Sequence, residues 1–584
     1  MGKLIISSLL IYLYMSYSYA EQLTVIASGP DDLNALTGPL GRTELIEDNG
    51  QGFYQKLSLM PFSQTKPGSF VNGGDELRFM GQNSAQLLVV ADGLSQQSAT
   101  GIGGSRSYHF LDPFFYDEMN IHVGGGSSVI GRGAFSGALE FTSKMVPQSK
   151  FLLTSGNNGF QKVAIKKVFL SKRQAWSVAA LRQFKSGPSL QPAVNGEPPE
   201  NDSRSLHVFK AGWKKFAGTD FGPEVQVNVF QDNQEFDQFQ IDDKRPYGRE
   251  KSYEVIAKNT SILFGDQIWK NVIRLQQNSR KVNNAFGDVE SLLTYNSQSV
   301  FVKTSLTAAE TPWFDQLNWG GEINQDISLE ITESNLSSPT EFRQNSLFAN
   351  GVIKTHSGQW RLGARMDQGI SASTFVGQVG YDFIGSKTKL CFQVGKNARF
   401  PSFYELFSIY GNDDLLPEKN YSSEFSFLYQ HQNMSFQIMG FYQRQRELIY
   451  YDFSRSRYEN NTKNNYAGAS INVSTRSTHF QINLGGSFTS SEKKELNIGV
   501  SPLKLQAGID YIFSDKWKMN IQEAFYSSKE NYGGTREGFQ IWNTVNLTYQ
   551  VSEIITANLV TQNKFQNDQF RDEQFKIMIQ GQIE

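Results

Sequence analysis

The sequence is poor in the features that mark several common protein classes. A single cysteine, Cys391, excludes an intramolecular disulfide. The six histidines are scattered along the chain without the spacing of a metal site. The formal net charge is only −2, which argues against nucleic acid as a partner. Beyond the N-terminus no run approaches about 18 consecutive apolar residues, so no transmembrane helix is expected in the mature chain.

The N-terminus has the pattern of a secretion signal. Lys3 supplies a positive charge, residues 4–15 form an apolar run, and Ser18-Tyr19-Ala20 is a cleavage site of the small-x-small type. The apolar run is too short to cross a bilayer comfortably, which favours cleavage over a membrane anchor. We therefore expect residues 1–20 to be removed on export.

From about Phe151 onward, apolar and polar residues alternate with a period of two. Over residues 503–513 one face carries Leu, Leu, Ala, Ile, Tyr and Phe, and the other carries Lys, Gln, Gly and Asp before Ile512. Runs of about ten residues suit tilted strands that cross a bilayer, and aromatic residues cluster at the strand ends. The strands of a soluble β-sandwich also alternate between apolar and polar residues. Against a sandwich, the second face here stays small and polar over about 440 residues without a domain break. The pattern favours an all-β transmembrane barrel.

The length of this region predicts the size of the barrel. Allowing about 20 residues for each strand and its connection, residues 146–584 suit about 22 antiparallel strands, with 20 or 24 left open. A final alternating run places Phe575, Ile577, Ile579 and Ile583 on one face. It ends in Glu584, where outer-membrane barrels usually end in an aromatic residue, so the assembly signal is weaker than usual.

A glycine-rich stretch precedes the barrel region. Residues 124–144 read GGGSSVIGRGAFSGALEFTSK, a composition that alone is typical of a flexible loop. The stretch resembles the end of the plug domain of TonB-dependent outer-membrane receptors, close to RGPSSALYGSGAIGGVINIVTK. The residues that carry this likeness are Gly124, Gly131, Gly133, Ala134 and Gly137.

Earlier segments resemble the same plug domain. Arg78 and Gly81 lie in LRFMG, where the family has IRIRG and where Met80 replaces the second arginine. The run QLLVVADGL at residues 86–94 resembles TLVLVDGV and predicts a buried strand followed by a turn at Asp92 and Gly93. A further segment has Asn120 and Val123 where the family has glutamate and arginine. The charges of the family's plug ion-pair network are therefore missing at these positions.

A second specific likeness lies within the barrel region. Residues 399–424 read RFPSFYELFSIYGNDDLLPEKNYSSE, which is similar to the FRAPSLYELF and GNPNLKPEKSYNYE segments of TonB-dependent receptors. Proline would end strand pairing at Pro401, and the next strand is expected from Phe425. An unrelated proline-punctuated loop is the alternative, which so many ordered matches disfavour. The matching residues are Phe400, Pro401, Leu406, Phe407, Leu416, Pro417, Glu418 and Glu424.

The resemblance implies a mixed α/β plug domain at 21–145, inside the lumen of a barrel at 146–584. It implies energised uptake of a bulky, scarce ligand of the iron-siderophore, haem or cobalamin type across the outer membrane of a Gram-negative-type bacterium. Loops around residues 95–107 and the glycine-rich turn would capture the ligand. The implied partners are TonB with its inner-membrane energising complex, the barrel assembly machinery and outer-membrane lipid, and the receptor is expected to be a monomer.

TonB would bind a short segment directly after the cleavage site, which resembles the TonB box. A β-branched segment at a free terminus suits strand addition to a partner's sheet edge. The alternative is that the segment is the first strand of the plug. The segment consists of Leu23, Thr24, Val25, Ile26 and Ala27.

Other functions remain as alternatives. A passive outer-membrane pore would share the alternation but would lack a plug, and a receptor-like protein uncoupled from TonB would bind without uptake. An exported hydrolase is disfavoured because there is no nucleophile elbow, no histidine clustered with carboxylates and no zinc-ligand spacing. No cofactor is expected. The four aspartates within residues 232–243 could hold Ca²⁺ through oxygen ligands, but their irregular spacing favours a solvated acidic loop.

Overall fold

The computed structural model describes residues 42–45, 57, 60–69, 74–98, 101–104, 108–143, 148–188, 201–215, 222–235, 247–263, 267–286, 289–309, 311–332, 340–370, 372–452, 454–493, 500–530, 536–566 and 569–583. The expected signal peptide and the segment at residues 23–27 lie outside these residues. Among the described residues, no helix is both long and apolar enough to span a membrane.

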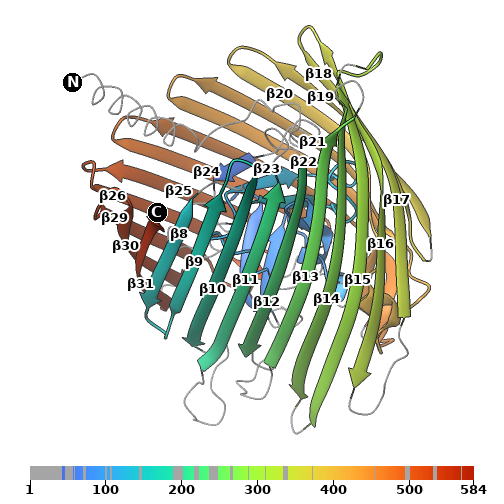
Figure 1. Cartoon of the computed structure of the whole chain (residues 1–584), viewed down its shortest axis with the longest axis horizontal. Helices are drawn as coiled ribbons and strands as arrows, with labels where there is room; N and C mark the ends of the chain where they lie inside the picture. The colour runs from blue at the N-terminus through green and yellow to red at the C-terminus, as the bar shows by residue number, and fades with distance from the viewer. Residues whose placement is uncertain are drawn as a thin grey trace.

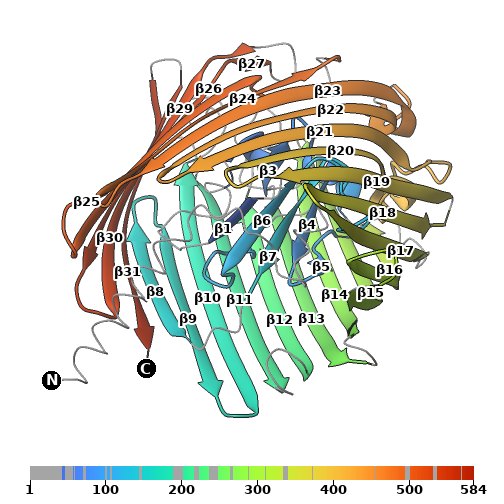
Figure 2. The ribbon, with the colours of Figure 1, turned by 90° about the horizontal axis from the view of Figure 1, so that it is seen from above.

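The larger part of the chain forms a closed barrel of 22 strands, as the length of the alternating region predicted. All neighbouring strands pair antiparallel, and β31 closes the ring against β8 (Figures 1 and 2). The strands are β8 (Ser149–Gly156), β9 (Gln161–Leu170), β10 (Gln174–Pro188), β11 (Asn201–Lys215), β12 (Gly222–Glu235), β13 (Tyr247–Ile262), β14 (Ile268–Phe286), β15 (Val289–Ala309), β16 (Gln316–Thr332), β17 (Thr340–Thr355), β18 (Gly358–Gln368), β19 (Ser373–Ile384), β20 (Thr388–Arg399), β21 (Glu418–His431), β22 (Met434–Asp452), β23 (Arg457–Arg476), β24 (Phe480–Ser491), β25 (Leu503–Ile512), β26 (Trp517–Tyr526), β29 (Gln540–Gln550), β30 (Ile555–Gln566) and β31 (Gln569–Ile583).

Side chains alternate between the outer surface and the lumen along these strands. In β25, Leu505 is 48% exposed on the outside, whereas its neighbour Lys504 is 2% exposed and points inward. In β31, Ile577 and Ile579 are exposed and Met578 is buried. A strand with apolar residues on one face only can pack one side against lipid and the other against a polar lumen. The alternation predicted for these two runs is confirmed.

The two rims of the barrel differ in their connections. One rim carries short turns, such as those between β9 and β10, β17 and β18, and β21 and β22. The opposite rim carries the long connection from β20 to β21, which includes helix α4 (Phe403–Phe407). Outer-membrane barrels have short turns on the periplasmic side and longer loops outside. We refer to the two rims as the short-turn rim and the long-loop rim.

A smaller sheet lies inside the ring (Figure 2). Its strand order is β1-β6-β7-β4-β5, and only the β4–β7 pair is parallel. We call it the inner sheet; its strands are β1 (Arg42–Leu45), β4 (Leu87–Ala91), β5 (Leu94–Ser95), β6 (Glu118–Val123) and β7 (Gly137–Thr142). A hairpin of β2 (Ser63–Ser69) and β3 (Gly74–Phe79) accompanies it, with the 3-10 helices η2 (Ser84–Gln86) and η3 (Ile102–Gly104). Another short hairpin, β27 (Lys529–Glu530) with β28 (Arg536–Glu537), lies between β26 and β29 in the chain.

The core of the inner sheet is continuous with the barrel wall. All five residues of β4 are buried, as predicted for this segment. Leu87, Val89 and Phe141 belong to one apolar cluster with wall residues such as Leu152 and Leu206. Burial of apolar area contributes about 25 cal/mol per Å², so this shared cluster holds the inner sheet in the lumen.

Candidate functional site

The glycine-rich segment between β6 and β7 is packed against strands β20 and β21 of the barrel. Gly125 N donates a hydrogen bond to Glu424 Oε1 (3.2 Å), and Ser127 N donates to Asn397 Oδ1 (3.0 Å). Asn420 Nδ2 donates to the carbonyl of Phe135 (2.7 Å). The segment is buried throughout except at Arg132, which is partly exposed. It is thus a fixed contact with the wall and not the flexible loop that its composition alone would suggest.

Two glycines are required because the wall comes so close. A Cβ on Gly124 would overlap the carboxylate of Glu424, and a Cβ on Gly125 would overlap the side-chain amide of Asn397. Gly124 also has φ +91°, a conformation that L side chains rarely adopt. The backbone must therefore lie bare against β20 and β21 for its N–H groups to reach the wall.

The other residues of this motif have separate positions. Gly131 and Gly133 lie in the turn, and Ala134 packs in a small buried cluster with Leu88 and Ile130. Gly137 is the first residue of β7 and lies against the carbonyl of His122. Of the glycines in this segment, Gly124 and Gly125 are the two that lie against Glu424 and Asn397 of the wall. The motif therefore combines contact with the wall and packing within the inner part of the chain.

The earlier motif residues lie in the hairpin beside the inner sheet and at two turns. Arg78 is a buried residue of β3, and Gly81 follows it in a turn with φ +80°. Asp92 and Gly93 form the predicted turn after β4, with φ +50° and +82°. Asp92 Oδ1 accepts hydrogen bonds from Ser143 N (2.7 Å) and Ser143 Oγ (2.8 Å), which ties this turn to the end of β7.

Met80, which replaces the family's second arginine, faces a neutral part of the wall. It is fully buried, and Gln443 Nε2 of β22 lies 3.9 Å from its sulfur. Gln82 hydrogen-bonds both Gln443 and Gln445, the latter at 2.6 Å. Amide groups of Gln82, Gln443 and Gln445 therefore make the contact with the wall beside Met80.

Asn120 and Val123 are both buried in β6. Asn120 stands opposite Glu140 in the register of β6 and β7. The nearby imidazole of His122 lies 3.5 Å from the carboxylate of Glu140. Polar groups thus remain on this strand pair, although the family's two charges do not.

The barrel motif forms an ordered connection at the long-loop rim. Strand β20 ends at Arg399, directly before Phe400 and Pro401, as the proline predicted. Helix α4 then begins with a capping box, in which Ser402 Oγ accepts from Glu405 N and the Glu405 carboxylate accepts from Ser402 N. The sequence analysis missed this helix, although the spacing Ser-x-x-Glu is the signal of such a cap.

Arg399 joins the two ends of this connection. Its Nε donates to Glu418 Oε2 (2.6 Å), and its Nη1 and Nη2 donate to the two oxygens of Glu405 (2.9 and 3.1 Å). All three side chains are at most 3% exposed. The expected start of the next strand at Phe425 was wrong: β21 begins at Glu418, because Glu418 pairs with Arg399 and accepts a hydrogen bond from Ile449 N (2.8 Å).

An aromatic cluster covers this connection. Leu406 and Tyr404 pack with Tyr295, Phe342, Leu415 and Tyr458, and Phe407 packs on the edge of the cluster. Phe400 and Pro417 are buried, whereas Leu416 is 45% exposed. Helix α4 also contacts η3 beside the inner sheet. The motif therefore builds one rigid piece of the long-loop rim that touches the contents of the lumen.

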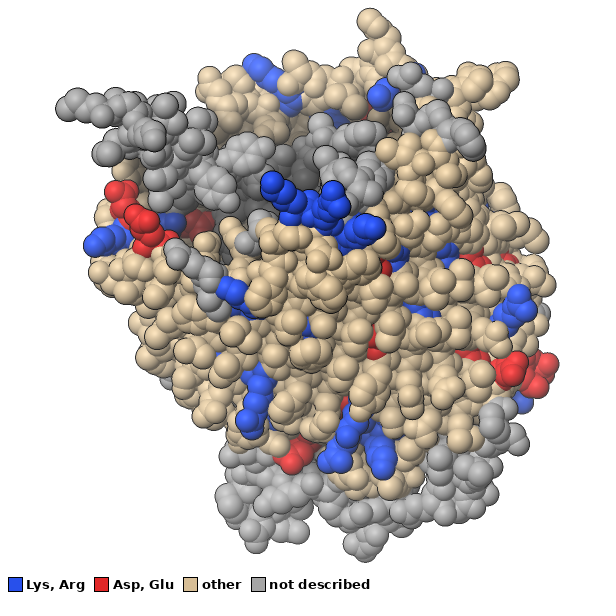
Figure 3. Space-filling model, in the orientation of Figure 1, with Lys and Arg blue, Asp and Glu red and all other residues tan. Residues whose placement is uncertain are grey.

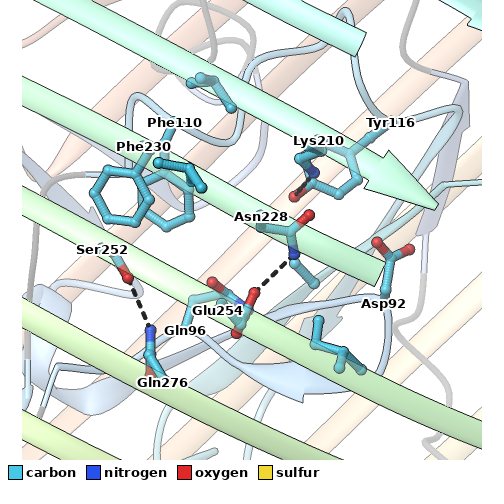
Figure 4. Close-up of a pocket in the computed structure, with 14 residues that line it drawn as sticks. Asp92, Gln96, Phe110, Tyr116, Lys210, Asn228, Phe230, Ser252, Glu254 and Gln276 are labelled. Atoms are coloured by element: carbon cyan, nitrogen blue, oxygen red, sulfur yellow. Dashed lines mark hydrogen bonds between the residues drawn. The ribbon is translucent and has the colours of Figure 1, made fainter. Parts of the chain in front are cut away.

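A small polar cavity separates the inner sheet from strands β11 to β14 (Figure 4). Lys210 Nζ donates to Tyr116 Oη (2.8 Å) and lies over the Tyr116 ring, while Asn228 Nδ2 donates to Glu254 Oε2 (2.8 Å). Burial raises the pKa of Tyr116 well above its usual value, and the charges of Asp92 and Glu254 raise it further. The cavity measures about 30 Å³, which suits one or two water molecules and not a bulky ligand.

Polar contacts hold the inner part of the chain to other strands of the wall. Arg274 Nη1 of β14 donates to the carbonyl of Ser95 (2.7 Å), and Lys162 of β9 pairs with Asp112 (2.8 Å). Lys504 of β25 donates to the carbonyl of Ser63 (3.1 Å). Buried charges need such partners, so displacing the inner sheet from the lumen would break contacts on several sides of the barrel.

Arg132 is a lumen charge that the sequence analysis did not single out. It lies at the turn of the glycine-rich segment. Burial lowers the pKa of its guanidinium, and the negative charges of Asp367, Glu322 and Asp326 act in the opposite direction. Its only sequence signal is that it is the one charged residue among the glycines at residues 124–137.

The described residues give no support to a metal site. No three His, Cys, Asp or Glu side chains are grouped to hold a metal within the described part of the chain. Of the four aspartates considered for Ca²⁺, Asp232 is buried and paired with Arg204. The other three lie outside the described residues.

Comparison with known proteins supports this architecture. The family model described as "TonB dependent receptor-like, beta-barrel" matches residues 182–563. The chain is 23% identical over 416 residues to the vitamin B12 transporter BtuB of Vibrio cholerae serotype O1. That match covers 65% of this chain and 62% of BtuB, so it spans less than two thirds of the curated relative.

Solved structures show the same fold. The ferric enterobactin receptor PfeA of Pseudomonas aeruginosa has a TM-score of 0.80 at 12% identity, over 96% of this chain and all of that one. The siderophore receptor PirA of Acinetobacter baumannii has a TM-score of 0.77 at 12% identity, over 96% and 100% of the two chains. The copper transporter OprC has a TM-score of 0.79 at 11% identity, over 94% and 99%. The chain therefore belongs to the TonB-dependent receptor family, whose members are transport barrels of the Gram-negative outer membrane and not enzymes.

Proposed function

We propose that this chain is a receptor for TonB-energised uptake of a bulky, scarce ligand across the outer membrane. The ligand would be a small-molecule metal chelate or a corrinoid, of the iron-siderophore, haem or cobalamin type. In this proposal residues 21–145 form the plug domain and residues 146–584 form the barrel. TonB would bind residues 23–27 by strand addition.

The observation that carries the proposal is the inner sheet fixed inside the barrel. Gly125, Ser127 and Phe135 contact β20 and β21, while Ser63, Ser95 and Asp112 contact other strands of the wall. A passive pore requires an open lumen, and this lumen is filled. A receptor requires a filled lumen, because the barrel then stays closed until work is done on the inner sheet.

The topology suggests where that work would act first. Among the described residues, strand β1 is the edge of the inner sheet and pairs with β6, from Arg42 opposite Ile121 to Leu45 opposite Glu118. Residues 23–27 precede β1 in the chain, so tension on them reaches this four-residue edge strand before the rest of the sheet. Edge pairing offers few hydrogen bonds to break, and β1 would detach before the core of β4, β6 and β7.

Uptake measurements test the proposal. The chain is expressed in an outer membrane that has TonB, and accumulation of radiolabelled ferric siderophores, haem and cobalamin is compared with that of Ile26→Pro. Proline removes a backbone donor needed for strand addition, so uptake of one ligand should collapse while surface binding persists. Ile26→Ala is the matched control, because it shortens the same side chain but keeps the donor.

Three outcomes would count against the proposal. Uptake that is unchanged by Ile26→Pro would indicate a passive pore. Binding without uptake in the unaltered chain would indicate a receptor uncoupled from TonB. Loss of surface binding in Ile26→Pro would show that the substitution disturbs the receptor as a whole, and the strand-addition step would then be withdrawn.

A further inference from the structure

The short-turn rim of strands β9 to β11 combines three basic side chains in one place. Lys172 and Arg173 lie in the turn between β9 and β10, and Lys215 is the last residue of β11. Together with Ser171 and Gln174 they line one shallow hollow on the surface. Figure 3 shows basic side chains gathered at this rim, in the upper middle of the view.

The turn that carries these charges is held in a defined shape. Ser171 N donates to the Gln174 carbonyl (2.8 Å), and Ser171 Oγ accepts from Gln174 N (3.2 Å). Gln174 in turn accepts a hydrogen bond from Trp213 Nε1 (3.3 Å), which links the turn to β11. The hollow is therefore preformed, which lowers the entropy cost of binding there.

A row of apolar side chains runs across the lipid-facing surface directly beside the hollow. Phe169, Trp176 and Trp213 are cross-strand neighbours on β9, β10 and β11. Phe169 and Trp176 are about half exposed, and the two indole rings lie 6.0 Å apart. Tryptophan rows of this kind sit at the headgroup level of a bilayer. Gln174 and Lys215 are two residues nearer the rim, about 7 Å along the strand.

The charges in the hollow lack acidic partners among the described residues. No carboxylate there lies within ion-pair distance of Lys172, Arg173 or Lys215. The short turn between β25 and β26 on the same rim, by contrast, carries both an acidic and a basic residue, Asp515 and Lys516. Three cations beside an aromatic row at headgroup depth would attract a phosphate anion.

We propose that this hollow binds the phosphate headgroup of an anionic phospholipid in the periplasmic leaflet. Arg173 would supply a planar fork for two phosphate oxygens, and Lys172 and Lys215 would supply single donors. The acyl chains would lie along the exposed rings of Phe169 and Trp176. A free phosphate ion offers the same anion but gains nothing from this apolar row, which is why the lipid is favoured.

Lipid titration of the purified full chain in detergent tests the proposal, with native mass spectrometry counting the bound lipids. Phosphatidylglycerol is compared with phosphatidylcholine of the same acyl chains. The variant K172Q/R173Q/K215Q should lose about tenfold or more of its preference for phosphatidylglycerol, since each basic residue adds to the attraction. The matched control K387Q/K516Q/K518Q removes the same charge from other strands of the same rim and should change the preference less than about twofold.

The unaltered chain gives a second measurement that does not depend on any variant. Its preference for phosphatidylglycerol should fall steeply as NaCl is raised from low to high concentration, because the contact is electrostatic and partly exposed. Inorganic phosphate at the lipid concentration should not displace the lipid. Equal lipid preference in the two triple variants, a salt-independent preference, or displacement by inorganic phosphate would each overturn the proposal. None of these readouts involves uptake, so the result stands apart from the proposed transport function.

Discussion

Gly125 and Glu424 meet across 299 positions of sequence, where the backbone N–H of the glycine donates to the buried carboxylate. The surroundings of this hydrogen bond are also constrained, because Gly124 leaves room for the Glu424 carboxylate and Asn397 fills the space beside Gly125. At this point bare backbone makes the contact with the polar wall, and no bulky side chain lies between them. The glycine-rich segment is therefore a structural contact of the filled barrel.

The substitution Gly125→Ala tests this contact. The added Cβ overlaps Asn397, so the segment should be pushed from β20 and β21 at a cost of about 1–3 kcal/mol. Thermal unfolding should begin at lower temperature, and protease should cut the inner sheet faster. Gly440→Ala is the control, because its added Cβ would have its nearest neighbour at an ordinary 3.8 Å. Equal behaviour of the two variants would contradict the close contact.

Removing Arg399 should loosen the connection between β20 and β21. Arg399→Ala leaves the carboxylates of Glu405 and Glu418 buried without their cation, which typically costs about 3–5 kcal/mol. Hydrogen exchange should rise in residues 403–407, and limited proteolysis should cut at residues 400–417. Arg455→Ala is the control, since Arg455 pairs with Glu459 on an exposed turn where an ion pair contributes little. Unchanged hydrogen exchange in Arg399→Ala would contradict the role of Arg399 in holding the connection between β20 and β21.

Tyr116→Phe tests the contact between the inner sheet and β11. It removes the acceptor of the Lys210 ammonium in a partly enclosed cavity, and such charge-assisted hydrogen bonds contribute about 1.5–3 kcal/mol. The variant should unfold at a lower temperature than the parent. Tyr381→Phe also loses hydroxyl contacts, with Thr355 and Ser357, but on an exposed surface. The decrease in unfolding temperature should be clearly smaller for Tyr381→Phe than for Tyr116→Phe. A larger decrease for Tyr381→Phe would count against the contact between Tyr116 and Lys210.

Local pattern predicted much of the fold but little of the site. Alternation along residues 503–511 and 575–579 predicted outward and inward faces correctly, because each side chain's face depends only on its position in its own strand. The buried strand β4 and the turn at Asp92 and Gly93 were predicted from the resemblance of residues 86–94 to the family's plug segment.

Contacts between distant segments could not be read in the same way. Nothing near Glu424 indicates that Gly125 binds it, because the pairing depends on how the inner sheet sits in the closed barrel. The start of β21 was misplaced because Glu418 gains its strand position from Arg399 and Ile449, which are distant in sequence. Helix α4 could have been predicted from the sequence, because Ser402 and Glu405 form its capping box within four consecutive residues.

Conductance of the purified chain in planar bilayers tests the central claim most directly, that the inner sheet closes the barrel. The full chain should insert without opening a steady large channel, because the inner sheet and the segments around it contact β9, β14, β20, β21 and β25 at once. A variant that lacks residues 42–143 should open a wide pore, as expected of an empty barrel of 22 strands. A steady large conductance from the full chain would contradict the account.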